Sequence, residues 1–173
     1  LYPVPPASMT EQKSIWLQIR RTRPDYAIMW GWGAMNSTAV KEAANIRFKM
    51  DHFIGNWWSG AEPDVIPAGK GAIGYVAATM HGAGTDYAIY KDIKKLYDAG
   101  KGTAKSFADV GNVLYSRGMV NAAYTVEAIR TAQAKYGNRA MTGAEVRWGF
   151  ENLNITKARI AEIGFTGLMP AVK

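Results

Sequence analysis

Cysteine is absent from the 173 residues, and histidine occurs only at His52 and His81. The sequence therefore excludes disulfides, a thiolate nucleophile and a cysteine-built zinc site. Two histidines leave little material for a histidine-rich metal centre or for histidine-dependent catalysis. We expect both to be loop or strand-edge residues, and we predict neither a metal site nor a cofactor.

Long apolar runs are also missing, because none reaches the roughly 20 residues that a membrane-spanning helix needs. No signal peptide is recognisable either: the chain starts at Leu1 without Met and continues directly into LYPVPP. We therefore interpret the chain as a mature or trimmed piece of a longer protein, whose targeting segment would lie elsewhere.

The excess of positive charge is scattered. Lys and Arg total 21 against 14 Asp and Glu, a formal net charge of +7, but no run of basic residues occurs. The densest cluster, in residues 20–23, falls at the end of a predicted helix, where cations are favoured by the helix dipole. Without a basic stripe, we do not expect nucleic acid to be a partner.

Motifs for catalysis are lacking as well. No Gly-x-Ser-x-Gly elbow occurs, and the acidic pairs Asp86/Asp92 and Glu145/Glu151 are typical of solvated helix faces. We predict that the chain is not an enzyme. An active site assembled from scattered residues is the alternative that sequence patterns do not reveal.

The first half of the chain alternates helices with short apolar segments that are typical of buried strands. The apolar spacing, the glycines and the prolines predict the following order: a helix opened by a Ser8–Glu11 capping box and ending near Thr22, a strand over 25–30, a helix from about Asn36, a strand over 52–55, a loop over 64–71 and a strand over 72–79. This order favours a parallel sheet with covering helices.

The second half is predicted to be helical. We expect a helix over 86–99 capped by Thr85, a loop over 101–108, and one long helix over about 111–136 that ends at Gly137. A Thr142–Glu145 capping box predicts a helix to about Leu153. A last helix over 156–163 and an extended segment over 165–173 complete the chain.

The turn between the first predicted strand and its helix contains Gly31-Trp32-Gly33, with Asp51 about 20 residues on, which imitates a dinucleotide fingerprint. The third glycine is replaced by Asn36, and Trp32 would crowd the approach of a pyrophosphate. Glycines that permit a tight turn explain the pattern more simply. A nucleotide-dependent enzyme using Gly31 and Gly33 stays as an alternative.

Four tryptophans follow the first two predicted strands: Trp30 and Trp32 after one, Trp57 and Trp58 after the other. Indole rings stack on planar ligands and offer a directed N–H donor. Trp30 fits a core position as well as a ligand site. Trp32 and Trp57 are better candidates, because they lie in turns that interrupt the packing pattern.

Several segments, in order, resemble one family. PDYAIMWGWGAMNSTAVKEA, FIGNWWSGAEPDVIPAG, GAIGYVA, VLYSRGMVNAAYTVEAIRTAQAKYG, TGAEVRWGFENLN and IAEIGFTGLMP are similar to the solute-binding proteins of bacterial ABC importers, specifically the Leu/Ile/Val-binding family. The resemblance covers essentially the whole chain. It implies a type I periplasmic binding protein-like α/β fold of two hinged lobes that close on a ligand, each with a parallel sheet and helices on both faces.

The resemblance also implies a domain plan. Residues 1–79 would belong to the second lobe, residues 80–140 would be a helical segment returning to the first lobe, and residues 141–173 would cross back towards the second lobe. The opening strands and helices of the first lobe would be missing, so the chain would be a fragment with a half-complete cleft.

The same resemblance nominates ligand-binding residues. Trp32 would be the ligand-facing aromatic of the first turn, with Asn36 nearby. Trp57, followed by Trp58, occupies the position where amino-acid binders carry an acid that reaches the ligand ammonium. This replacement favours a carboxylate ligand without a required ammonium, such as an aromatic acid.

A helix that would lie over the cleft contributes Tyr115 and Arg117. Arg117 could bind a carboxylate with two hydrogen bonds, or it could form a surface or interlobe salt bridge. The resemblance thus implies a periplasmic solute-binding component of an ABC importer, with an amino acid or organic carboxylate as ligand and membrane permease subunits as partners. A sensory ligand-binding domain of the same fold is the alternative.

Overall fold

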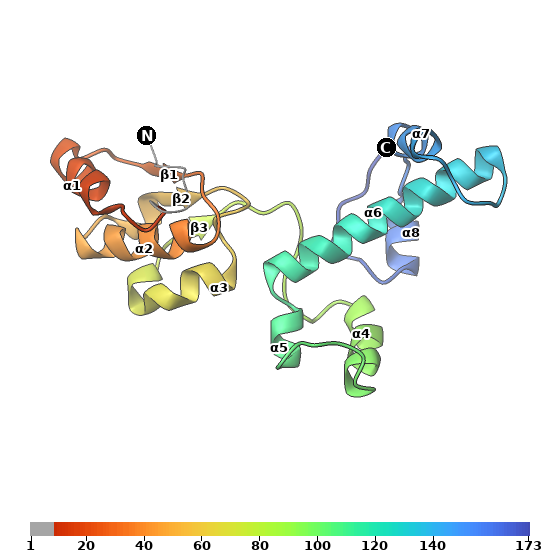
Figure 1. The fold of residues 1–173 in the computed structure, drawn as a ribbon, viewed down its shortest axis with the longest axis horizontal. Helices are drawn as coiled ribbons and strands as arrows, with labels where there is room; N and C mark the ends of the chain where they lie inside the picture. The colour runs from red at the N-terminus through yellow and green to blue at the C-terminus, as the bar shows by residue number, and fades with distance from the viewer. Residues whose placement is uncertain (1–8) are drawn as a thin grey trace. The chain divides into compact units, whose positions relative to one another are not determined.

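The structure is a computed structural model that describes residues 9–173. The chain divides into two compact units, Leu1–Thr79 and Met80–Lys173, drawn in red to yellow and in green to blue in Figure 1. Unit 1 contains the sheet and unit 2 is mainly helical. The assignment of either unit to a lobe stays a prediction.

Unit 1 is an α/β arrangement around three short parallel strands in the order β1-β2-β3. Ile28 of β1 is in register with Ile54 of β2, which in turn is in register with Val76 of β3. The predicted parallel sheet is therefore confirmed. The elements are α1 (Lys13–Thr22), β1 (Ala27–Met29), α2 (Ala34–Asn45), η2 (Met50–His52), β2 (Phe53–Gly55), α3 (Glu62–Val65), η3 (Ile66–Ala72) and β3 (Val76–Ala77).

Helix α1 begins later than the capping box predicts. Its N-cap is Gln12, whereas Ser8 lies outside the described residues. The side-chain amide of Gln12 donates to the carbonyl of Met35 at 2.9 Å, so the start of α1 is held by α2. Tertiary contact decides this helix start. The helix ends as predicted, because Arg23 takes a left-handed conformation before Pro24.

The core of unit 1 lies between the helices and one face of the sheet. Trp16 of α1 packs edge-to-face on Phe53 of β2, with ring centroids 5.0 Å apart, and α2 adds small and medium apolar side chains. On the opposite face Ile28, Ile54 and Val76 form an exposed row across the three strands. Among the described residues of unit 1, helices thus cover one face of the sheet.

The segment after β2 is more helical than predicted. Residues 64–71 were expected to be a loop, but α3 and η3 occupy most of this stretch, with a break at Gly69, where φ is +55°. Pro63 and Pro67 sit in first-turn positions, where a missing N–H costs nothing. The strand expected over 72–79 is correspondingly reduced to Val76–Ala77.

Unit 2 is built on the long helix that the sequence predicts. Asn112 caps it by accepting a hydrogen bond from the backbone N–H of Tyr115, and Gly137 ends it. Strands are limited to one antiparallel bridge between Ile155 and Val172 in this described unit. Its helices are α4 (Ile89–Asp98), α5 (Phe107–Val110), α6 (Val113–Tyr136), α7 (Gly143–Glu151) and α8 (Lys157–Glu162).

Two expectations for unit 2 are wrong in detail. Helix α4 starts at Ile89 with Ala88 as its N-cap, so Thr85 does not cap it. The backbone N–H of Ile89, in the first turn of α4, instead donates to the carbonyl of Gly164 at 3.0 Å. The loop over 101–108 gives way near its end to α5, which Ser106 caps.

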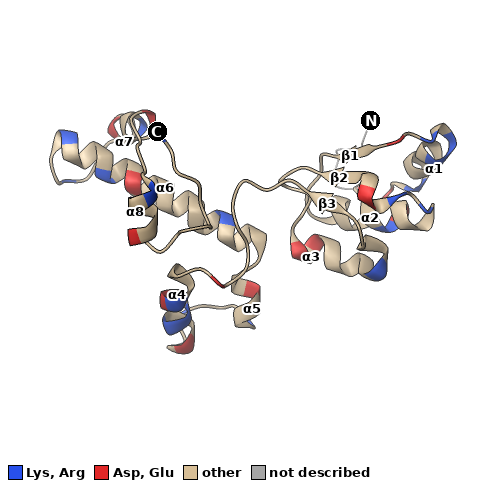
Figure 2. Ribbon diagram, turned by 180° about the vertical axis from the view of Figure 1, so that it is seen from behind, with Lys and Arg blue, Asp and Glu red and all other residues tan. Residues whose placement is uncertain are grey.

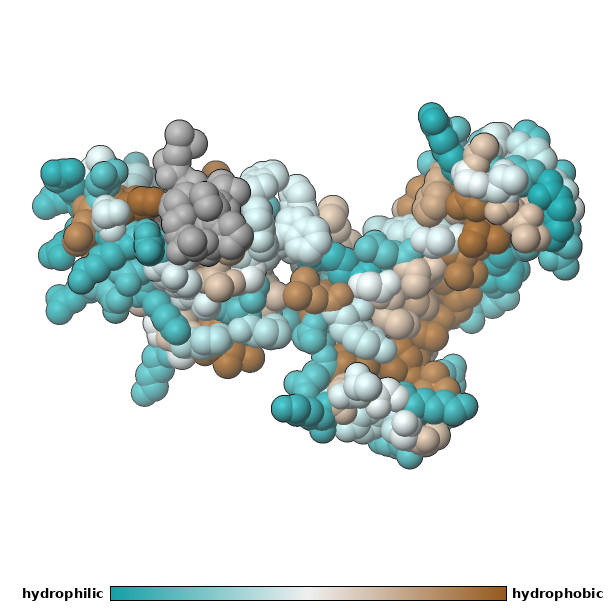
Figure 3. Space-filling model, viewed as in Figure 1, coloured by the Kyte–Doolittle hydropathy of each residue, from teal (hydrophilic) through white to brown (hydrophobic). Residues whose placement is uncertain are grey.

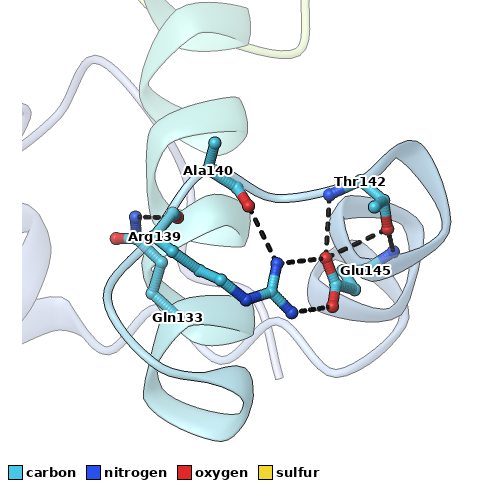
Figure 4. Close-up of polar contacts among 5 residues, drawn as sticks. All are labelled: Gln133, Arg139, Ala140, Thr142 and Glu145. Atoms are coloured by element: carbon cyan, nitrogen blue, oxygen red, sulfur yellow. Dashed lines mark hydrogen bonds and ion pairs between the residues drawn. The ribbon is translucent and has the colours of Figure 1, made fainter.

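The predicted capping box of α7 is confirmed. The Thr142 hydroxyl accepts from the N–H of Glu145, and the Glu145 carboxylate accepts from the N–H of Thr142 at 2.8 Å (Figure 4). Arg139 also donates to both carboxylate oxygens from the preceding loop. These hydrogen bonds lower the pKa of Glu145 to about 2, with that from Arg139 contributing most.

Helices α6 and α7 cross at close range through Gly149. A Cβ atom on Gly149 would lie 2.1 Å from the carbonyl oxygen of Ala128, so only glycine permits this approach. Both helices belong to unit 2, and the division predicted at 140/141 stays a prediction. Leu114 and Val126 of α6 are exposed. Hydrophobic residues also gather on the face of unit 2 that the space-filling view shows (Figure 3).

Charged residues are distributed over the helices of both units and form no continuous basic stripe on the visible ribbon (Figure 2). The cations of residues 20–23 lie at the end of α1, as the sequence predicts. Within residues 9–173, every helix is too short or too polar to cross a lipid bilayer.

Candidate ligand-binding site

The candidate site lies where β1 and β2 end. Because these neighbouring strands are parallel, the turns that follow them meet at one edge of the sheet. The turn after β1 contains Trp30 and Trp32, and the turn after β2 contains Trp57 and Trp58. The backbone N–H of Asn56 donates to the carbonyl of Met29 at 3.0 Å and extends the pairing of the two strands into the turns.

A buried serine fastens the two turns to each other. The Ser59 hydroxyl accepts from the N–H of Gly31 at 3.2 Å and lies 2.9 Å from the Gly31 carbonyl oxygen. It also lies 2.8 Å from the side-chain oxygen of Asn56. The single hydroxyl proton can serve one of these acceptors at a time, while the bond from Gly31 stays in place.

Tyr75, just before β3, completes this network. Its hydroxyl donates to the carbonyl of Ser59 at 2.8 Å. Burial raises the pKa of Tyr75 to about 12, although the hydrogen bond at Ser59 acts in the opposite direction. The phenol therefore stays protonated, and a donor, throughout the physiological pH range.

Three indoles form a pocket at this edge. Trp30, Trp32 and Trp58 line a cavity of about 400 Å³. Each of the three is 47% to 65% exposed, whereas Trp is usually highly buried in folded proteins. The core of unit 1 does not include them. The pocket is thus an apolar, concave surface held on two cross-linked turns.

The fourth tryptophan has a different position. Trp57 is half-buried and contacts Trp30 edge-to-face, with centroids 5.2 Å apart and an interplanar angle of 73°. This geometry is the favoured one for aromatic pairs. Trp57 therefore supports the Trp30 ring, and Trp58 supplies the pocket wall. Trp30, which fitted core and site equally well from the sequence, belongs to the pocket.

Asn36 is fully buried in the first turn of α2. Its side-chain amide donates to the carbonyl of Trp58 at 2.9 Å and to the carboxylate of Asp64 at 3.0 Å. These bonds fix the backbone that carries the Trp58 ring. Direct contact between Asn36 and a ligand stays a prediction.

The Gly31–Gly33 turn has a structural explanation. The N–H of Gly31 is bonded to Ser59. A Cβ on Gly31 would lie 3.0 Å from the side-chain oxygen of buried Asn36 and would displace the flexible end of the Met29 side chain. Gly33 takes φ = +55°, which favours glycine. Both glycines are therefore accounted for by the turn itself, without a phosphate.

The remaining candidates belong to unit 2, on the first turns of α6. Tyr115 is 39% exposed, and its ring centroid lies 6.3 Å from that of Tyr90. Arg117 is 9% exposed, and its Nε donates to Nε2 of His81 at 3.3 Å. Burial lowers the pKa of Arg117. A guanidinium nevertheless remains charged. Arg117 is therefore a buried cation two residues after Tyr115.

Sequence reasoning missed the residues that hold the tryptophans in place. Ser59, Asn56 and Tyr75 carry no motif, and their roles depend on contacts between segments far apart in the chain. The position of Trp30 could have been predicted from the sequence. Tyr26, Ile28 and Trp30 are spaced two residues apart, which places their side chains on one face of the strand. All three are exposed.

Comparison with known proteins agrees with this architecture. A periplasmic binding protein family model matches residues 2–168. No curated protein matches the chain at a significant level. A crystal structure described as an ABC transporter permease from the Pseudomonas fluorescens group is 46% identical with a TM-score of 0.84, over 95% of this chain and 40% of that one.

A second solved structure, described as the substrate-binding protein of an ABC transporter from Aeropyrum pernix, is 17% identical with a TM-score of 0.69. At this identity the likeness shows the fold alone. It covers 95% of this chain and 41% of that one, so the present chain spans about two fifths of the length of either structure. With the family model matching nearly its whole length, the chain belongs to the periplasmic binding protein family.

Proposed function

We propose that the chain is part of the solute-binding component of an ABC importer and that it captures a small organic acid or amino acid. The observation that carries this proposal is the pocket of Trp30, Trp32 and Trp58 at the carboxyl edge of a parallel sheet, in a member of the periplasmic binding protein family. Ligands of open α/β sheets collect at this edge.

The pocket has the properties of a binding site for a small molecule. Its volume of about 400 Å³ lies within the roughly 300–1,000 Å³ that such sites occupy. Its walls are apolar, and its supporting turns are joined by buried hydrogen bonds through Ser59 and Asn36. Such a preformed site binds a ligand without first ordering its own loops.

The acidic group of the ligand requires a cation. Arg117, with five N–H donors in a planar fork, is the candidate that can bind a carboxylate through two hydrogen bonds. Tyr115, two residues earlier, offers a partly exposed phenol. We assign Arg117 to the carboxylate and Tyr115 to the ligand surface as parts of the proposal, and Asn36, which is fully buried, to the support of the Trp58 turn.

The proposed protein performs no chemistry. It would act in the periplasm, hand the solute to membrane permease subunits, and leave ATP hydrolysis to another subunit. Both a branched-chain amino acid and an aromatic carboxylate fit this role. The ligand-binding domain of a sensor would bind in the same way, and its defining difference would lie in its partner.

Isothermal titration calorimetry of the full-length protein that contains this chain tests the proposal. The panel contains L-leucine, L-phenylalanine, 3-phenylpropionate and hexanoate, and we expect saturable binding of at least one. Arg117→Met should weaken the binding of a carboxylate by about tenfold or more, since it removes a charged hydrogen-bonding partner. Lys135→Met, a cation elsewhere on α6, serves as the control. If no panel member binds, the proposal is contradicted, and saturable NAD binding would favour the nucleotide alternative.

A further inference from the structure

We infer that the pocket of Trp30, Trp32 and Trp58 receives a planar aromatic ring, and that the ligand is an aromatic carboxylate that does not need an ammonium group. This inference rests on the proposed function and specifies its substrate class. It is drawn from the chemistry of the pocket walls, their exposure and their supports.

The walls offer π surface and no charge. The lining consists of three indole rings, and within the described part of the chain no carboxylate contributes to it. An aromatic ring gains offset or edge-to-face contacts with these indoles. A ligand ammonium would meet indole faces, which attract cations, but no carboxylate partner among the described residues of the lining. The lining of three indoles therefore suits an aromatic ring and provides no ion pair for an amino group.

The nearby carboxylate is already engaged. Asp64 accepts a hydrogen bond at 3.0 Å from Asn36, a residue with no solvent exposure. The same Asn36 amide holds the Trp58 carbonyl at 2.9 Å. Recruiting Asp64 to a ligand ammonium would compete with the bonds that position Trp58. The hydrogen bonds of Asn36 and Asp64 thus hold the Trp58 turn in place.

The size of the pocket matches a ring with a substituent. An apolar cavity of about 150 Å³ is enough to bind benzene, and this pocket measures about 400 Å³. The pocket has room for a single aromatic ring with a short side chain. The additional length would carry the carboxylate away from the indoles.

The exposure of the three rings is unusual without a ligand. Trp30 is 65% exposed, and Trp32 and Trp58 are each 47% exposed, although all three are held on well-bonded turns. Trp57 braces Trp30 at a centroid distance of 5.2 Å. A set of exposed indoles facing one cavity has a large apolar surface available for a planar partner.

Matched ligands test the inference on the full-length protein that contains this chain, by calorimetry and by tryptophan fluorescence. The ligands are 3-phenylpropionate, 3-cyclohexylpropionate, which keeps the carboxylate but loses the planar ring, and L-phenylalanine, which adds only the ammonium. We expect 3-phenylpropionate to bind about tenfold more tightly than its saturated analogue, and L-phenylalanine to bind no more tightly than 3-phenylpropionate.

Substitution assigns the preference to the pocket. Trp58→Leu and Trp32→Leu should each reduce the ring preference at least about threefold, because each removes one indole contact. Trp148→Leu is the matched control: Trp148 packs on Tyr136 in unit 2, outside the pocket, and its loss should leave the preference unchanged. Circular dichroism and thermal melts verify that each variant folds, and the two pocket variants provide independent tests.

The outcomes separate the inference from the proposed function. Equal affinity for the two rings, tighter binding of L-phenylalanine, or an unchanged preference in both pocket variants would overturn the inference. Binding of leucine or hexanoate without binding of 3-phenylpropionate would overturn it as well, while the proposed function would stand. Failure of every acid and amino acid to bind would contradict both.

Discussion

The hydroxyl oxygen of Ser59 lies 2.9 Å from the carbonyl oxygen of Gly31, a residue 28 positions earlier in the chain. The same hydroxyl accepts from the Gly31 N–H. One buried hydroxyl thereby accepts from the N–H of a glycine in the neighbouring turn and lies within hydrogen-bonding distance of its carbonyl oxygen. The two tryptophan-bearing turns depend on this contact for their spacing.

Ser59→Ala should therefore destabilise the protein. The substitution leaves the buried N–H of Gly31 without its acceptor, which costs about 1–3 kcal/mol in the free energy of unfolding. Chemical denaturation followed by circular dichroism measures the change. Ser37→Ala is the control, because Ser37 bonds only the carbonyl three residues earlier in an exposed helix turn. Equal effects of the two substitutions would contradict the role given to Ser59.

Gly149→Ala should disrupt the crossing of α6 and α7. The added methyl group would meet the Ala128 carbonyl oxygen at 2.1 Å, so the helices would have to separate. We expect a loss of about 2 kcal/mol or more in the free energy of unfolding. Gly143→Ala, in the first turn of the same helix, meets nothing within 4 Å and should cause no loss. A variant Gly149→Ala as stable as Gly143→Ala would show that the helices do not approach this closely.

Glu145 predicts a dependence of stability on acid pH. Its folded-state pKa is lowered to about 2 from an ordinary value of 4.5, chiefly by the hydrogen bond from Arg139 and then by that from Thr142. A lowered pKa means that the carboxylate stabilises the fold above about pH 4.5 and that this contribution disappears as the pH falls towards 2.

Thermal melts between pH 7 and pH 2 can isolate this contribution. Glu145→Gln should be less stable than the wild type at pH 7, and the difference should shrink between pH 4.5 and pH 2. Glu151→Gln, which removes the partner of Arg147 on the same helix, controls for the loss of an exposed charge. A difference that persists unchanged to pH 2 would contradict the lowered pKa.

A two-pronged ion pair joins α6 to α8. Nε and Nη2 of Arg159 donate to the two carboxylate oxygens of Glu127 at 3.0 and 2.8 Å, and both side chains are partly buried. The hydrogen bond from Arg159 lowers the pKa of Glu127. Arg159→Lys keeps the charge but loses the planar fork.

We expect Arg159→Lys to lower the free energy of unfolding by about 1 kcal/mol. The matched control is Arg147→Lys, whose exposed pairing with Glu151 along α7 should be replaced with little change. Urea denaturation at neutral pH measures both variants. Tolerance of lysine at both positions would mean that the fork geometry at Arg159 contributes nothing.

Local patterns predict the elements whose ends are fixed by nearby residues. The capping box at Thr142 and Glu145 and the terminal Gly137 act within a few residues, and both are found where the sequence places them. The start of α1 is different, since Gln12 bonds to Met35, 23 positions away. Thr85 also fails as a cap because the amide of Ile89 is bonded by Gly164 instead.

The candidate site follows the same division. The resemblance and the turn chemistry bring attention to Trp32, Trp57 and Trp58, since these follow strands. Which indole faces the cavity depends on side-chain packing between turns, and there Trp58 lines the pocket while Trp57 packs on Trp30. The sequence alone does not reveal which of these two adjacent tryptophans lines the pocket.

The bond between Ser59 and Gly31 also has a kinetic consequence. Since the two turns are fastened before any solute arrives, the indole walls need no slow rearrangement to accept a ring. The first contact with this pocket should then show an observed rate that rises linearly with solute concentration. Differences in affinity among solutes would then arise mainly from differences in their dissociation rates.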